Sequence, residues 1–152
     1  MNHSFILKAE WDGGRNSEGR MEAGQLRTAI SIPKEMGGPG IGTNPDEMLL
    51  GAAATCYLIT LAAMMERNGL PVKKLSLESE GIVDVTNNIF TYASITHKPY
   101  ILLMEEASEK DLELARKLAE KAETSCMISR AVAGNVVLST VPRIEKSGGD
   151  EI

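Results

Sequence analysis

The longest periodic stretch of the chain is apolar on every side. From Met48 to Met65 the sequence carries no charge, and Gly69 follows soon after. Asn44, Pro45 and Glu47 are the residue types that begin helices: a capping side chain, a proline at the first position and an acid at the third. We therefore predict a helix that starts after Asn44 and ends before Gly69.

A second helix is predicted after Ser108, and it is amphipathic. Its apolar stripe, with Lys and Glu opposite, comprises Leu112, Ala115, Leu118, Ala119 and Ala122. Residues that alternate between apolar and polar predict strands in 5–11 and 26–32, a hairpin turned by Asn87 and Asn88, and a last strand in 135–141. Strands, helix, strands, helix and strand, in that order, predict an α+β fold with largely antiparallel sheet.

Size and composition indicate one domain. The chain has 152 residues, of which 43 % are hydrophobic and 24 % charged, as in globular proteins. No linker divides it, so we predict a single domain over residues 1–142 and a polar tail over 143–152.

Three interpretations of the apolar helix compete. Its uncharged run reaches the lower limit for a membrane span, but it is rich in Gly and Ala and lacks an aromatic belt and basic flanks. A core helix apolar on all sides needs cover on all sides, which a chain of this size can hardly supply. We favour a helix buried partly by its own sheet and partly by a second subunit, and expect no membrane partner.

Charge and candidate ligands argue against two other classes of protein. The net charge is −5, and no Lys or Arg cluster stands beside stacking aromatics, which disfavours a nucleic-acid partner. Cys56 and Cys126 have no zinc spacing, and His3 and His97 have no second ligand nearby, so we expect no metal. The N-terminus does not resemble a signal peptide, which predicts a cytoplasmic, reducing location.

The two cysteines stand in different local contexts. Cys56 lies in the middle of the apolar helix, far from the N-terminal amides that lower a thiol pKa, and inert core filling is the simplest interpretation. To react, it needs an arginine from elsewhere in the fold. Cys126 follows the second helix, where Thr124 or Ser125 could cap a new short helix and favour a thiolate. Periodicity does not decide whether the two thiols meet.

Three segments together resemble the OsmC/Ohr family of peroxide-reducing proteins, closer to its organic hydroperoxide resistance branch. They are GGR, IPKEMGGPGIGTNPDEMLLGAAATC and SCMIS followed by GNVVL. The resemblance covers nearly the whole chain, and the stretch from Ile32 to Cys56 is its most specific part. It implies an intertwined α+β homodimer with the cysteine-bearing helices at its centre.

The resemblance also implies a mechanism. Cys56 attacks an organic, possibly fatty-acid, hydroperoxide, and its sulfenic acid condenses with Cys126 to a disulfide. An external dithiol of the lipoyl type restores both thiols, and no cofactor is bound. The family arginine that stabilises the thiolate corresponds to Arg15, and the acid that holds this arginine corresponds to Asp46.

Two positions depart from the family pattern. The family acid is usually Glu, whereas this chain has Asp46 followed by Glu47. At about 100° per residue, Asp46 lies roughly 80° from Cys56 around the helix and Glu47 lies nearly opposite, so Glu47 is at most a supporting residue. The family sequence after the second cysteine is typically Cys-Pro-x-Ser, and here Met127 replaces the proline.

Alternatives to Arg15 and to catalysis follow from the same sequence. Arg20 and Arg27 are rivals for the arginine role, although each also suits an exposed strand position. The alternative function is a non-catalytic dimer that binds small lipophilic ligands or senses redox state through its disulfide. Turnover with a lipoyl-type dithiol separates the two functions.

Overall fold

The computed structural model describes residues 1–148, and these pack as two compact units, 1–48 and 49–148. Both units combine strands with helical segments, and the complete fold is α+β with two long helices, as predicted.

The first unit is built on a three-stranded antiparallel sheet. Its strands are β1 (Lys8–Trp11), β2 (Gly19–Ala23) and β3 (Leu26–Ile30), in the order β1-β2-β3. The strand predicted from Phe5 begins only at Lys8, which pairs with Glu22 just before β2 turns at Gly24. β2 did not emerge from the sequence because its alternation contains a single large apolar residue, Met21.

A Gly/Pro loop after β3 folds back on the strand and determines where the first long helix begins. It contains the short 3-10 helix η1 (Lys34–Met36). The Ser31 hydroxyl donates to the carbonyl oxygen of Ile41 over 2.8 Å and accepts from its N–H, and the Thr43 N–H donates to the Ala29 carbonyl over 2.9 Å. These bonds return the chain to β3 and deliver Asn44 to the start of α1.

Helix α1 (Pro45–Arg67) begins and ends as the sequence predicts. The Asn44 Oδ1 accepts from the Glu47 N–H over 2.9 Å, which satisfies one free amide of the first turn. At the other end, Gly69 takes a positive φ of 65° that favours glycine. The Asn44 cap and the Gly69 stop are therefore both confirmed.

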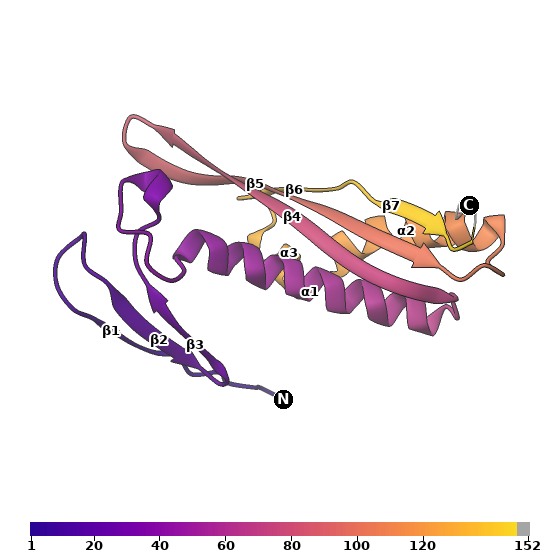
Figure 1. Cartoon of the computed structure of the whole chain (residues 1–152), viewed down its shortest axis with the longest axis horizontal. Helices are drawn as coiled ribbons and strands as arrows, with labels where there is room; N and C mark the ends of the chain where they lie inside the picture. The colour runs from indigo at the N-terminus through magenta and orange to yellow at the C-terminus, as the bar shows by residue number, and fades with distance from the viewer. Residues whose placement is uncertain (149–152) are drawn as a thin grey trace. The chain divides into compact units, whose positions relative to one another are not determined.

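The second unit is a mixed sheet with helices on one face. Strands β4 (Val72–Thr86) and β5 (Ile89–Leu103) form one long antiparallel ribbon that runs along α1 (Figure 1). Asn87 and Asn88, both with positive φ, make the predicted two-residue turn. β6 (Val137–Thr140) and β7 (Arg143–Lys146) pair in parallel with successive parts of β5, so the otherwise antiparallel sheet contains two parallel pairings.

The polar tail predicted from residue 143 is wrong for Arg143–Lys146, because these residues form β7. The strand is held by its register with Tyr100–Leu103 and by an ion pair of 2.8 Å between Arg143 and Glu145. The sequence did not predict this strand because its side chains are mostly polar, while the pairing with β5 is made by the backbone. Residues 149–152 of the predicted tail lie outside the described part of the chain.

Helix α2 (Glu109–Ser125) confirms the second helical prediction. Ser108 caps it, and a capping box links the side chains of Ser108 and Asp111 to each other's backbone. The predicted stripe of Ala115, Leu118, Ala119 and Ala122 is buried. The short helix α3 (Met127–Val132) follows directly, with Cys126 itself at the N-cap rather than Thr124 or Ser125, which end α2.

The core of the second unit lies between one face of β5 and the two long helices. Alternate residues of β5 are buried on this face, from Ile95 to Leu103, and pack against α1 and α2. The buried stripe of α1 consists of Ala53, Tyr57, Leu61, Met64 and Met65. By length and composition alone α1 could cross a membrane, and within this unit it packs through the buried stripe.

Only one side of α1 is covered within the described residues. Thr55, Ile59 and Ala62, at helical spacing, are exposed on the other side, and Ile59 is 70 % exposed. The apolar sequence of this helix was the basis for predicting a second subunit. The exposed side of α1 is a surface that such a subunit could cover.

Candidate active site

Tyr57 fixes the segment of α1 that carries Cys56. Its ring stacks on the buried imidazole of His97 in β5, with centroids 4.5 Å apart and an angle of 11° between the planes. Its hydroxyl donates to the carbonyl oxygen of Ala119 in α2 over 2.7 Å. One buried side chain thus ties α1 to the sheet and to the second long helix, and it leaves the adjacent Cys56 half-buried beside α3.

The structure brings Cys56 and Cys126 together. Both are free thiols, Cys126 is fully buried at the junction of α2 and α3, and the two sulfur atoms interact directly. Ile128 and Val132 of α3 pack against a buried cluster that includes Ala53 of α1, so α3 and α1 share this part of the core. Periodicity left this meeting open, because it depends on contacts between helices that are distant in the sequence.

The surroundings of Cys56 favour its thiolate. Burial by itself would raise the pKa of Cys56, but hydrogen bonds from the Cys126 thiol, from the backbone N–H groups of Ile128 and Met127, and from the Thr60 side chain outweigh it. The pKa of Cys56 is therefore lowered from its ordinary value. Cys56 lies in the middle of α1, where the amides of its own helix are already used. The first turn of α3 supplies the amides that lower its pKa instead.

Cys126 has the opposite tendency, contrary to the prediction that its helix start favours a thiolate. Burial is the main cause that raises the pKa of Cys126, and the neighbouring Cys56 raises it further. The Ser129 and Ile128 amides and the Ser129 hydroxyl act in the other direction but do not compensate. Of the two thiols, Cys56 is therefore the more acidic.

Thr60, the Met127 and Ile128 amides, and Ser129 belong to this site but were missed by sequence reasoning. Thr60 is one helical turn after Cys56, which is a usable signal. The Met127 amide has a further consequence, because the proline typical of the family at this position has no N–H to donate. The departure at Met127 gives Cys56 a hydrogen-bond donor that a proline lacks.

Arg15 lies in the first unit, in the turn between β1 and β2. Its guanidinium donates to the Asn16 Oδ1 over 2.8 Å and to the Met36 carbonyl oxygen over 3.2 Å. Both acceptors are neutral, and the second links the turn to η1. The Arg15 side chain is exposed.

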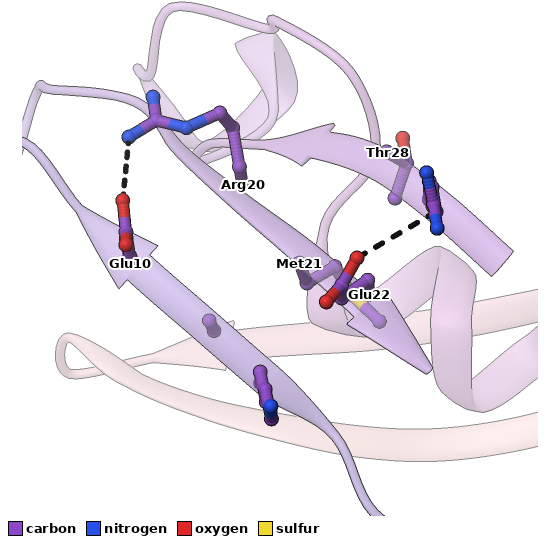
Figure 2. A pocket seen from close by; sticks show the side chains of 8 residues that line it. Glu10, Arg20, Met21, Glu22 and Thr28 are labelled. Atoms are coloured by element: carbon purple, nitrogen blue, oxygen red, sulfur yellow. Dashed lines mark hydrogen bonds and ion pairs between the residues drawn. The ribbon is translucent and has the colours of Figure 1, made fainter. Parts of the chain in front are cut away.

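The rival arginines are engaged in ion pairs on the three-stranded sheet. Arg20 contacts Glu10 over 3.1 Å and Asp12 over 3.0 Å, and Arg27 contacts Glu22 over 3.6 Å. Figure 2 shows the pair of Arg20 with Glu10 among the residues that line a pocket on this sheet, and Glu22 and Arg27 belong to the same lining. Their role as exposed strand residues, the simpler interpretation, accounts for both.

The two candidate acids stand in the first turn of α1. Glu47 accepts from the Thr43 hydroxyl over 2.9 Å and donates its N–H to Asn44, so its contacts serve the start of the helix. Asp46 is half-buried at the preceding position. The clamp between Asp46 and Arg15 stays a prediction. Within residues 1–148 no group of three or more His, Cys, Asp and Glu side chains could hold a metal ion.

Comparison with known proteins identifies the family. Residues 37–141 match the family described as OsmC-like protein. The chain belongs to the OsmC-like protein family. It is 60 % identical to the uncharacterized protein YmaD of Bacillus subtilis (strain 168), over 97 % of this chain and 98 % of YmaD.

Other OsmC-like relatives bear names that refer to organic hydroperoxides. An organic hydroperoxide resistance protein of Xanthomonas axonopodis pv. citri (strain 306) is 26 % identical over 87 % of this chain and 89 % of its own. The crystal structure of an organic hydroperoxide resistance protein from Legionella pneumophila superposes with a TM-score of 0.75 and 26 % identity, over 93 % of this chain and 97 % of that one. The predicted OsmC/Ohr family and α+β fold are thereby confirmed.

Proposed function

We propose that this OsmC-like protein is a cysteine-based peroxidase that reduces organic hydroperoxides. The observation that carries the proposal is the convergence on Cys56 of a thiol, two backbone amides and a hydroxyl that together lower its pKa. A thiolate with a second thiol beside it is the arrangement that a two-cysteine peroxidase needs. The names of the Xanthomonas and Legionella relatives support organic hydroperoxides as the substrate class.

The proposed first half-reaction oxidises Cys56. Its thiolate attacks one peroxide oxygen, the O–O bond breaks, and the other oxygen leaves as an alkoxide that takes up a proton to form the alcohol. The Cys56 sulfenic acid then reacts with the Cys126 thiol, whose sulfur forms the disulfide bond while the hydroxyl of the sulfenic acid departs as water. Because Cys126 already contacts Cys56, little rearrangement is needed for this second step.

Arg15 and Asp46 complete the proposed machinery on the basis of the family resemblance. The guanidinium would stabilise the Cys56 thiolate and the departing oxygen, and Asp46 would orient it. The neutral hydrogen-bond acceptors of Arg15 support this choice over Arg20 and Arg27, which are held by carboxylates.

We further propose that the working form is a homodimer, supported by the exposed apolar side of α1. A charged residue at Ile59 should separate the subunits, because it places a charge on an otherwise apolar surface. Light scattering on the wild type and on Ile59→Glu tests this, and a wild-type monomer at micromolar concentration would contradict it. The cycle consumes a reduced dithiol, which fits a reducing compartment such as the cytoplasm.

Steady-state turnover tests the function directly. The purified protein is assayed with cumene hydroperoxide, a fatty-acid hydroperoxide and hydrogen peroxide, each with dihydrolipoamide and with thioredoxin. We expect the fastest consumption of the organic peroxides with dihydrolipoamide, and none in Cys56→Ser. A wild type that forms the disulfide once but is not reduced by any of these dithiols favours the redox-sensing alternative.

A further inference from the structure

We propose that Ser129 is a positioning residue for the regeneration half of the cycle, and that its hydroxyl donates a hydrogen bond to the Cys126 thiolate as the disulfide opens. The proposal rests on the proposed peroxidase function, because it concerns the disulfide between Cys56 and Cys126. It assigns a role to a buried group that the oxidation of Cys56 does not use.

The Ser129 hydroxyl is buried without a hydrogen-bond partner among the described residues. Ser129 is 2 % exposed. Its Oγ and the His97 Nε2 are both buried side-chain atoms without a hydrogen-bond partner in the described part of the chain. Buried hydroxyl groups are ordinarily hydrogen-bonded, so an unsatisfied one points to a partner that is present in another state of the site. In the reduced site the Cys126 thiol interacts with Cys56, which leaves the Ser129 hydroxyl unpaired.

The position of Ser129 in α3 places this residue one helical turn after Cys126. Cys126 is the N-cap of α3 and Ser129 is the third residue of the helix, the position nearest a capping side chain, and the Cys126 side chain makes no capping hydrogen bond in this state. Ser129 favours the anionic form of Cys126 and acts to lower the pKa of Cys126, against the larger effect of burial. The hydroxyl acquires a strong acceptor only when Cys126 becomes an anion.

The two sulfur atoms differ in their exposure to solvent, and this difference decides which of them leaves when the disulfide is reduced. Cys126 is fully buried whereas Cys56 is half-buried, so a dithiol from solution reaches the sulfur of Cys56. Thiol–disulfide exchange is faster when the departing thiol is acidic. Attack on Cys56 expels Cys126, the less acidic of the two, and a hydrogen bond to its developing charge offsets that disadvantage.

The proposed regeneration step balances with a dithiol that carries one thiolate and one thiol. The thiolate bonds to the Cys56 sulfur, the bond between Cys56 and Cys126 breaks, and its electron pair stays on Cys126, which accepts the Ser129 hydrogen bond. The proton of the second reductant thiol passes to Cys126, and the resulting thiolate attacks the reductant's own sulfur in the mixed disulfide. The reductant leaves as a cyclic disulfide, and the protein returns to a Cys56 thiolate and a Cys126 thiol.

The test isolates reduction from peroxide chemistry. The protein disulfide is formed with diamide, excess diamide is removed, and dihydrolipoamide is added, with acid quenching and mass spectrometry of alkylated thiols. We expect Ser129→Ala to slow reduction on the order of tenfold, and more than it slows oxidation of Cys56 by cumene hydroperoxide. Ser129→Thr keeps the hydroxyl and should recover part of the rate, and the exposed neighbour Ser125→Ala should behave as the wild type.

Two further readouts separate this role from a structural one. In a Cys56→Ser background, Ser129→Ala should raise the pH at which the Cys126 thiolate absorbance appears near 240 nm. In the quenched wild type, the reductant should be attached to the peptide that contains Cys56.

Equal reduction rates for the wild type and Ser129→Ala would overturn the proposal, and so would an adduct on Cys126. A wild type that consumes no peroxide but retains the Ser129 effect on the diamide-formed disulfide would reject the peroxidase function alone.

Discussion

The middle of α1 and the junction of α2 with α3 each hold one thiol, and they give these thiols opposite acidities. Cys56 has no amide of its own helix available, yet its pKa is lowered by donors from Cys126, α3 and Thr60. Cys126 occupies the N-cap of a helix, where thiols are commonly acidified, yet burial and Cys56 raise its pKa. The position of a cysteine within its own helix is therefore a poor guide to its acidity here.

The comparison indicates that the two thiols work as one unit. The fully buried thiol has the raised pKa, and its hydrogen bond to the more accessible thiol helps to lower the pKa of that thiol. Removal of either cysteine must therefore change the acidity of the other.

The largest effect on peroxide consumption is expected from substitution of the cysteines themselves. Cys56→Ser should reduce peroxide consumption to the rate of buffer alone, because no other described thiol is accessible. Cys126→Ser should complete one oxidation and leave a sulfenic acid that excess peroxide oxidises further. Mass spectrometry of the first oxidised residue checks both, and oxidation of Cys126 before Cys56 would reverse the roles.

Arg15→Met should slow the first oxidation of Cys56 by about tenfold to a hundredfold, since a charged hydrogen-bond donor is lost. Arg15→Lys should recover only part of the rate, because an ammonium does not reproduce the planar fork of the guanidinium. Rapid-mixing measurements with cumene hydroperoxide check this.

Arg20→Met and Arg27→Met are matched controls on the first sheet and should retain wild-type rates. If one of them is slow while Arg15→Met is not, the arginine role moves to that residue.

Met127→Pro removes one backbone N–H near Cys56 and so tests how much that amide contributes to the acidity of Cys56. Proline suits the first position of α3 but has no N–H, so the helix should remain while Cys56 loses a donor. We expect the pKa of Cys56 to rise and the first oxidation at neutral pH to slow by about fivefold. Thiolate absorbance titrated in the Cys126→Ser background measures the change in pKa. Met127→Ala retains the amide and should match the wild type.

The smallest effect concerns stability near the site. Burial lowers the pKa of His97, so the folded protein binds fewer protons at this residue than the unfolded chain. Its contribution is therefore fully present above the unfolded value, about pH 6.5, and is lost as the pH falls toward the lowered folded value. Urea unfolding from pH 7.5 to pH 5 should have a steeper pH dependence in the wild type than in His97→Phe. Equal slopes would exclude His97 as the cause.

Local chemistry made much of the fold predictable. Asn44 and Gly69 bound α1, Ser108 begins α2, and Asn87 with Asn88 turns the hairpin, because capping and positive φ depend on residues close in sequence. β2 and β7 were missed because their charged side chains hide the alternation, while the backbone of a neighbouring strand supplies the pairing. That pairing is decided by residues far away in the chain.

The sequence by itself determined the family, the α+β class, the long apolar helix and the identity of the two candidate thiols. The residue types in these segments have conformational and chemical preferences that do not depend on tertiary contacts. Only the tertiary structure decided that Cys56 meets Cys126, that Met127 and Ile128 turn their amides toward Cys56, and that Ser129 is buried without a partner. Acidity depends on every donor and every buried surface around a sulfur atom, and these come from separate helices that only packing brings together.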